Sequence, residues 1–227
     1  MKANALIISV SALLVCTSAL AASIKVEDGE SRPGSNYTAI NKSVQIGDGA
    51  EIGDIDSVNG AIRIGNNAIV GDVESVNGSV KINKGANVQS VEVVNGAINL
   101  GSEVIVDSSV QSVNGSIQTD NGVSIGQGIS TVNGGIELTG TTVQGDLETY
   151  NGSITLDQTE ILGDLRVSKS KGWSWNKKNA KPNQISIGPD TVIHGTLYFE
   201  KKVQLTVHPS ATIGDIIGDE VERGDMR

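Results

Sequence analysis

Apolar residues recur along this chain with a period of 18 or 19 residues, and each period begins with an asparagine. The third and fifth residues after the asparagine are almost all Val, Ile or Leu, whereas the fourth is polar. This alternation is typical of a β-strand with one buried face. The seven asparagines that mark the period are Asn41, Asn59, Asn77, Asn95, Asn114, Asn133 and Asn151.

Three further apolar columns follow in each period, beginning at Ile52, Ile55 and Val58 in the first repeat. We expect all of these columns to point inward. Three short inward-facing stretches in every 18 residues predict a coil with three faces of about six residues each.

Two architectures could use this repeat. Asn-Gly is a strong signal for a tight hairpin, which would give an antiparallel meander. However, each position keeps its residue type from repeat to repeat, so equivalent residues are expected to stack on one another by translation. This favours a parallel solenoid with coils about 4.8 Å apart. The asparagines would then form a ladder of stacked amides, and the following glycines would occupy a corner that requires a positive φ.

The sequence therefore predicts an all-β, three-faced parallel β-helix of about nine coils with 18–19 residues per coil, and the crossover rule favours a right-handed coil. Only 3% of the residues are aromatic, which fits a thin interior filled by Val and Ile. We expect an N-terminal cap over residues 22–40 and a solenoid over 41–217. An insertion interrupts the solenoid at 168–184, and residues 218–227 form a charged, solvated tail.

The first 21 residues have the pattern of a secretory signal peptide. Lys2 precedes the apolar run Ala5–Val15, and Ala19-Leu20-Ala21 has the small-x-small form of a cleavage site. This predicts a periplasmic or secreted protein with no transmembrane span in its mature chain. An alternative is lipoprotein anchoring through Cys16, although Val15 is an unusual residue before a lipid-modified cysteine.

The Asn-Gly-Ser-Ile phrase alternates with the segments Ala50–Ile55, Ala68–Val73 and Val143–Leu147, which share a Gly-Asp pair followed by an apolar residue. This combination resembles the bactofilins, a class of polymer-forming β-helical proteins, and also secreted β-solenoids classed as adhesins. The resemblance covers roughly residues 41–217. It implies a right-handed β-helix that can associate end to end, while the export signal departs from the cytosolic bactofilins.

Charge and motif content argue against several function classes. The net charge of −9 is unfavourable for binding the phosphates of nucleic acids. The two histidines, His194 and His208, have no cysteine or carboxylate at a recognisable ligand or catalytic spacing. We therefore expect no catalytic residues, no metal site and no cofactor.

The insertion is positively charged, whereas the chain as a whole is acidic. It carries five lysines, no acidic residue and both tryptophans of the chain. Trp173 and Trp175 would face the same way in an extended segment and could stack on a sugar, with Lys177 and Lys178 beside them. The alternative is that a tryptophan covers the edge of a coil.

Acidic residues stack near the other end of the repeat region. Asp54 lies one coil from Asp72, while Asp56, Glu74 and Glu92 occupy one column, so like charges would lie close together on adjacent strands. Such an acidic strip is either a solvated face or a site for a divalent cation or a basic partner.

These features together predict a non-enzymatic, exported structural or binding β-solenoid, an envelope or surface scaffold or adhesin-like protein that self-associates end to end. One alternative is a carbohydrate-binding module that uses the insertion to bind envelope polysaccharide. A less favoured alternative is a polysaccharide-active β-helix enzyme.

Overall fold

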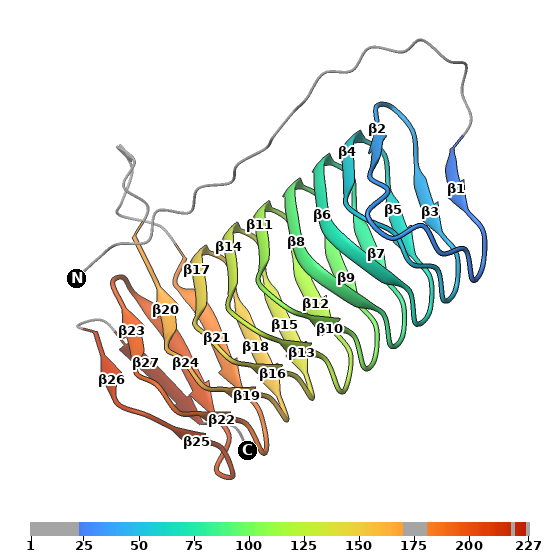
Figure 1. Ribbon diagram of the computed structural model, residues 1–227. Helices are drawn as coiled ribbons and strands as arrows, with labels where there is room; N and C mark the ends of the chain where they lie inside the picture. The colour runs from blue at the N-terminus through green and yellow to red at the C-terminus, as the bar shows by residue number, and fades with distance from the viewer. Residues whose placement is uncertain (1–22, 170–180, 219–220, 226–227) are drawn as a thin grey trace.

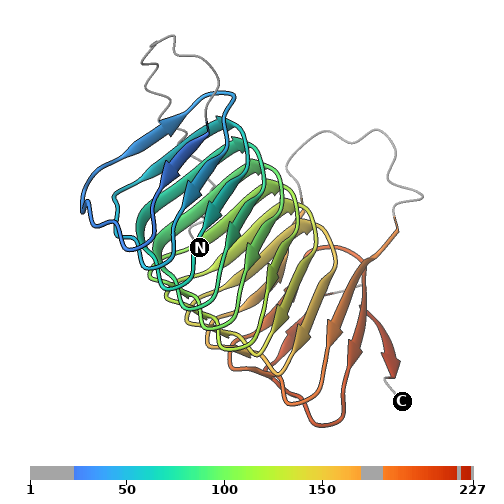
Figure 2. The same ribbon diagram turned by 90° about the vertical axis from the view of Figure 1, so that its right-hand side faces the viewer.

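The computed structural model describes residues 23–169, 181–218 and 221–225 as one parallel β-solenoid (Figure 1). Every strand pairing in it is parallel, which confirms the predicted fold class and excludes the antiparallel meander. The chain passes eleven times through the first wall of the solenoid, so it completes about ten turns rather than the nine predicted. The stacked coils are seen from a second direction in Figure 2.

Three walls surround the interior, and most coils contribute one short strand to each wall. The first wall contains β1 (Ile24–Val26), β3 (Val44–Ile46), β5 (Ile62–Ile64), β7 (Val80–Ile82), β9 (Ile98–Leu100), β12 (Ile117–Thr119), β15 (Ile136–Thr139), β18 (Ile154–Asp157), β21 (Asn183–Ile187), β24 (Val203–Val207) and β27 (Val221–Asp225). The second wall contains β2 (Tyr37–Ala39), β4 (Ile55–Asn59), β11 (Val110–Asn114), β14 (Ile129–Asn133), β17 (Leu147–Asn151), β20 (Leu165–Val167), β23 (Leu197–Phe199) and β26 (Ile216–Ile217). The third wall contains β10 (Ile105–Val106), β13 (Ser124–Ile125), β16 (Thr142–Val143), β19 (Glu160–Ile161), β22 (Val192–Ile193) and β25 (Thr212–Ile213), while β6 (Ile69–Asn77) and β8 (Asn87–Asn95) run through both the third and the second wall.

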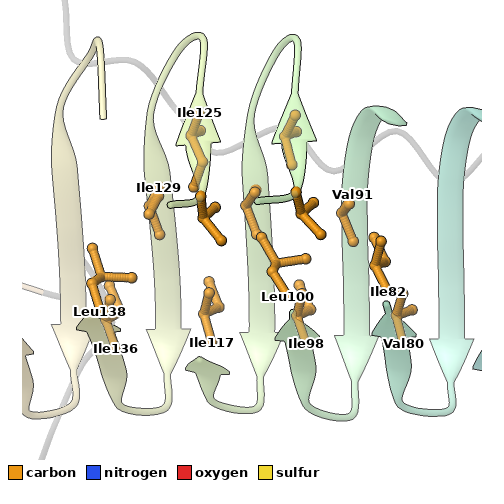
Figure 3. Close-up of a cluster of buried hydrophobic side chains, with 14 of the residues drawn as sticks. Val80, Ile82, Val91, Ile98, Leu100, Ile117, Ile125, Ile129, Ile136 and Leu138 are labelled. Carbon is orange, nitrogen blue, oxygen red and sulfur yellow. The ribbon is translucent and has the colours of Figure 1, made fainter. Parts of the chain in front are cut away.

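The interior is filled by columns of Val, Ile and Leu from all three walls, as Figure 3 shows for the central coils. Val80, Ile98, Ile117 and Ile136 stack in register on the first wall and are almost completely buried. Branched aliphatic side chains suit this narrow space because they are compact and fill it, whereas most aromatic rings would be too wide. Burial of these columns is the main contribution to stability.

The predicted inward direction of the Val58 column is wrong. Strict alternation along β4 buries Ile55 and Ser57 and leaves Val58 half-buried on the outer side. The buried column therefore carries small hydroxyl residues in several coils, while a row of half-buried apolar residues lies on the outside of the second wall. The hydroxyl residues of the buried column are Ser57, Ser75, Ser112, Thr131 and Thr149.

The glycines after the asparagines are required for a different reason than predicted. Only Gly96 among them has a positive φ (+155°). Instead, each glycine packs against the backbone of the preceding coil, so a Cβ at Gly78 would lie 2.0 Å from the carbonyl oxygen of Gly60 and one at Gly152 1.8 Å from that of Gly134. The corner excludes any side chain at this position.

The two ends also differ from the prediction. Residues expected to form an N-terminal cap include β1 and β2, which pair with β3 and β4 as a regular coil. Residues expected to form a solvated tail include β27, which pairs with β24. The expected insertion is shorter at its C-terminal side, because Asn183 and Gln184 already belong to β21.

Candidate functional site

The acidic strip lies on the second wall, where β4, β6 and β8 place Asp56, Glu74 and Glu92 side by side. These three side chains are half-buried on the outer surface. None of them forms a salt bridge with another described residue. The column therefore holds like charges in register without a compensating cation.

This arrangement shifts the protonation of all three groups. Partial burial, followed by repulsion from Asp56 and Glu92, raises the pKa of Glu74 to about 7. Burial and neighbouring carboxylates also raise the pKa of Asp56 and of Glu92. In addition, one carboxylate oxygen of Glu92, Oε2, is buried without a hydrogen-bond partner among the described residues. Near neutral pH the strip therefore holds a proton that isolated carboxylates would have released.

Asp54 and Asp72, which we assigned to the same strip, have a structural role at the adjoining corner. Asp54 Oδ1 accepts a hydrogen bond from the backbone N–H of Asp72 at 3.0 Å, and its Oδ2 accepts one from Asn36 Nδ2 at 2.9 Å. Asp72 Oδ1 accepts a hydrogen bond from Ser90 Oγ at 2.5 Å. These carboxylates satisfy donors where the chain turns between two walls.

Further along the same column of this corner lies a second acidic cluster, which was not predicted from the sequence. Asp164 N–H donates to Asp146 Oδ1 at 2.8 Å, and Thr196 N–H donates to Asp164 Oδ1 at 2.8 Å. Here the charge is compensated, because Arg166 forms salt bridges with both carboxylates and stacks over the ring of Tyr198 at 4.5 Å. A Gly-Asp pair in the repeat marks this corner, so the pairs could have identified both acidic clusters from the sequence.

The asparagines form one continuous line of hydrogen bonds along the corner between the second and first walls. Each Nδ2 from Asn59 to Asn151 donates to the Oδ1 of the asparagine in the preceding coil at 2.7–3.1 Å. All these bonds point in the same direction, and we call this line the asparagine ladder.

The insertion residues Trp173, Trp175, Lys177 and Lys178 lie outside the described residues, as do Cys16 and the expected signal peptide. The described chain leaves the second wall after β20 at Lys169 and returns at Lys181 before β21. The insertion therefore emerges at the corner of the asparagine ladder, far along the rod from β4 and β6 (Figure 1). The structure does not bring the acidic strip and the base of the insertion together.

The histidines have ordinary surface partners. His194 Nε2 lies 2.9 Å from Glu160 Oε1, and His208 Nδ1 lies 2.9 Å from Ser210 Oγ. The described part of the chain holds no group of three His, Cys, Asp or Glu side chains placed to bind a metal ion. It also contains no helix with the length and hydrophobicity needed to cross a bilayer.

Comparisons with known proteins give no match for this chain. No family model matches the sequence, and no curated protein or solved structure is significantly similar to it.

Proposed function

We propose that this protein is an exported, non-enzymatic structural β-solenoid that serves as an envelope or surface scaffold of the bactofilin-like or adhesin type. The observation that carries the proposal is the continuity of its inward columns and of the asparagine ladder through successive coils. Each coil is held by the coils on either side of it. The result is a stiff rod whose walls carry regular, outward-facing columns of side chains.

End-to-end association is part of this proposal, and the two ends offer different surfaces. The N-terminal end presents the strand edges of β1 and β2. The C-terminal end has a hollow of about 480 Å³ lined by Leu205, Val207, Ile213 and Ile216, with Arg223 at its side. Unpaired strand edges are surfaces on which another chain can add a strand, and heterologous contacts of this kind build filaments.

Cell fractionation with N-terminal sequencing of the mature chain, combined with light scattering of the purified protein, tests both parts of the proposal. A chain that begins near Ala22 in the periplasm or medium, and that forms assemblies larger than a monomer, is the expected result. Assembly should weaken when Lys177 and Lys178 are both changed to Glu, because these lysines would attract the acidic end of the next rod at low salt. A cytosolic chain, or a monomer at every concentration and salt, would contradict the proposal.

A carbohydrate-binding role is the second candidate. Tyr150, Arg166 and Tyr198 lie on the outer side of the second wall, on the strands nearest to the base of the insertion. Aromatic rings with polar neighbours suit sugar stacking, and Trp173 and Trp175 would extend such a platform. Binding to isolated envelope polysaccharide that is lost in the Trp173→Ala, Trp175→Ala double variant would favour this role over a scaffold. Release of soluble sugars from the polysaccharide would instead indicate an enzyme.

A further inference from the structure

Backbone hydrogen bonds between the coils protect five Asn-Gly steps of the asparagine ladder from a reaction to which such steps are prone. In this reaction the glycine nitrogen attacks the side-chain amide of the preceding asparagine. In the folded protein that nitrogen is occupied, because each glycine N–H donates to the carbonyl of the asparagine one coil further on at 3.0–3.2 Å. The protected glycines are Gly60, Gly78, Gly96, Gly115 and Gly134.

The sixth Asn-Gly step of the ladder, Asn151-Gly152, lies at its end and lacks this protection. The register of β17 with β20 places Lys169 at the next position of the column. Nevertheless, the carbonyl of Lys169 does not accept from Gly152 N–H, and this N–H has no hydrogen-bond partner in the described part of the chain. The series of glycine N–H bonds to the next coil ends at Gly152, because the chain leaves the regular coil for the insertion after Lys169. Asn151 itself is exposed.

A lysine two coils further on reaches back to the end of the ladder. Lys201 occupies the ladder column after Lys169, and its Nζ donates to Asn151 Oδ1 at 3.1 Å and to the carbonyl oxygen of Tyr150. On its other side, Asn151 Nδ2 donates to Asn133 Oδ1 at 3.1 Å. The amide oxygen of Asn151 therefore lies next to a cation, whereas the amide oxygens of the other asparagines in the ladder accept from an amide.

We propose that Asn151-Gly152 is a site of spontaneous deamidation in the folded protein, and that the solenoid shields the other six Asn-Gly steps. Five of these belong to the asparagine ladder, and the sixth is Asn121-Gly122, whose glycine N–H donates to the carbonyl oxygen of Gly140 at 2.8 Å. The nitrogen of Gly152 loses its proton and attacks Cγ of Asn151, so that a new N–Cγ bond closes a five-membered imide. Nδ2 takes up the proton and leaves as ammonia. Water then opens the imide at either carbonyl, which leaves aspartate or isoaspartate at position 151.

The product differs from the asparagine in charge and in its hydrogen bonds. The new carboxylate faces Lys201, which can compensate its charge. At the same time, the donor to Asn133 Oδ1 is lost, so the last hydrogen bond of the ladder is broken. Isoaspartate additionally lengthens the backbone at the corner where the insertion leaves the solenoid.

The experiment follows deamidation of the folded, full-length wild-type protein by peptide mapping and mass spectrometry during incubation at mildly alkaline pH. Asn77 and Asn114 are matched internal controls, because all three steps read Asn-Gly-Ser. We expect Asn151 to react on the order of tenfold faster, since its glycine nitrogen does not first have to give up a backbone hydrogen bond. An Asn151→Asp variant supplies the chromatographic standard for the product.

The same measurement in concentrated urea removes the effect of the fold. There the three matched steps should react at similar rates, because the solenoid no longer shields any of them. Equal rates for Asn77, Asn114 and Asn151 in the folded protein would overturn the proposal. A higher rate at Asn151 that persists in urea would also overturn it, because it would place the cause in the local sequence.

Discussion

Glu74 on β6 lies directly opposite Glu92 on β8, and neither carboxylate forms a salt bridge with another described residue. The second wall therefore contains a repulsive contact that depends on pH. Because Asp56 lies on the other side of Glu74, the central carboxylate of the column has the pKa that is raised to about 7.

We predict that the protein is more stable at pH 5 than at pH 8. The pKa of Glu74 is raised in the folded state, so between its ordinary value and about 7 the folded protein holds a proton that the unfolded chain has released. Stability therefore falls as pH rises through this window. Glu74→Gln should raise the melting temperature at pH 8 by roughly 2–4 °C, corresponding to about 1 kcal/mol after allowance for solvent screening.

Thermal unfolding of the wild type, Glu74→Gln and the exposed control Asp120→Asn at pH 5 and pH 8 checks this prediction. The gain should be confined to Glu74→Gln and should be smaller at pH 5. A wild-type melting temperature that rises from pH 5 to pH 8, with no gain in the variant, would show that the strip is fully solvated.

Two adjacent glycines, Gly134 and Gly135, test whether the corner after each ladder asparagine excludes a side chain. Gly134→Ala should destabilise the protein by about 1–3 kcal/mol, because its Cβ would lie 2.0 Å from the carbonyl oxygen of Gly115. Gly135→Ala should be close to neutral, since its nearest neighbour would lie at an ordinary contact distance of 3.6 Å. Chemical denaturation of both variants provides the comparison. Equal losses would mean that the corner has room to move.

The fold could be predicted from the sequence because translation repeats the same residue type at the same position in coil after coil. Residues three and five positions after each asparagine are inward on the first wall as expected, as Ile98 and Leu100 show. The error at Ser57 and Val58 has a clear origin. A narrow interior accepts a small hydroxyl residue such as Ser57. Hydrophobicity alone therefore predicted the wrong inward residue at this position, Val58 in place of Ser57.

The ends and the corners could be predicted less well. β1 and β27 lack the Asn-Gly phrase, and only their pairing with β3 and β24 shows that they continue the solenoid. Asp54 and Asp72 were grouped with the outer column because the sequence does not show their hydrogen-bond partners one coil further on. These partners are the backbone N–H of Asp72 for Asp54 and the hydroxyl of Ser90 for Asp72.

Ile98→Asp should unfold the central coils. Ile98 is completely buried between Val80 and Ile117 on the first wall, and an unpaired carboxylate there costs several kcal/mol. Arg63→Asp is the control, because Arg63 is exposed on the outer side of β5. Far-UV circular dichroism and melting of both variants measure the difference. A native spectrum with an unchanged melting temperature for Ile98→Asp would contradict the importance of this column.

The last prediction concerns Arg223, which interrupts an inward column at the C-terminal end. The register of β24 with β27 places Arg223 next to Leu205, which in turn pairs with Ile185. A charged residue in this position opposes continuation of the apolar column into another molecule, a common way to protect the end of a sheet. Arg223→Ile should therefore increase the size of assemblies at a given concentration, measured by light scattering, and leave the circular dichroism spectrum unchanged.

Gln204→Ile is the matched control for Arg223→Ile, because it adds the same side chain to the exposed outer side of β24. If apolar surface alone promoted association, both variants would assemble to the same extent. Assembly of the Arg223→Ile variant alone would show that the inward column controls contact through this end. Wild-type behaviour of both variants would indicate that the rods do not meet through the C-terminal coil, which would leave the edges of β1 and β2 as the surface for association.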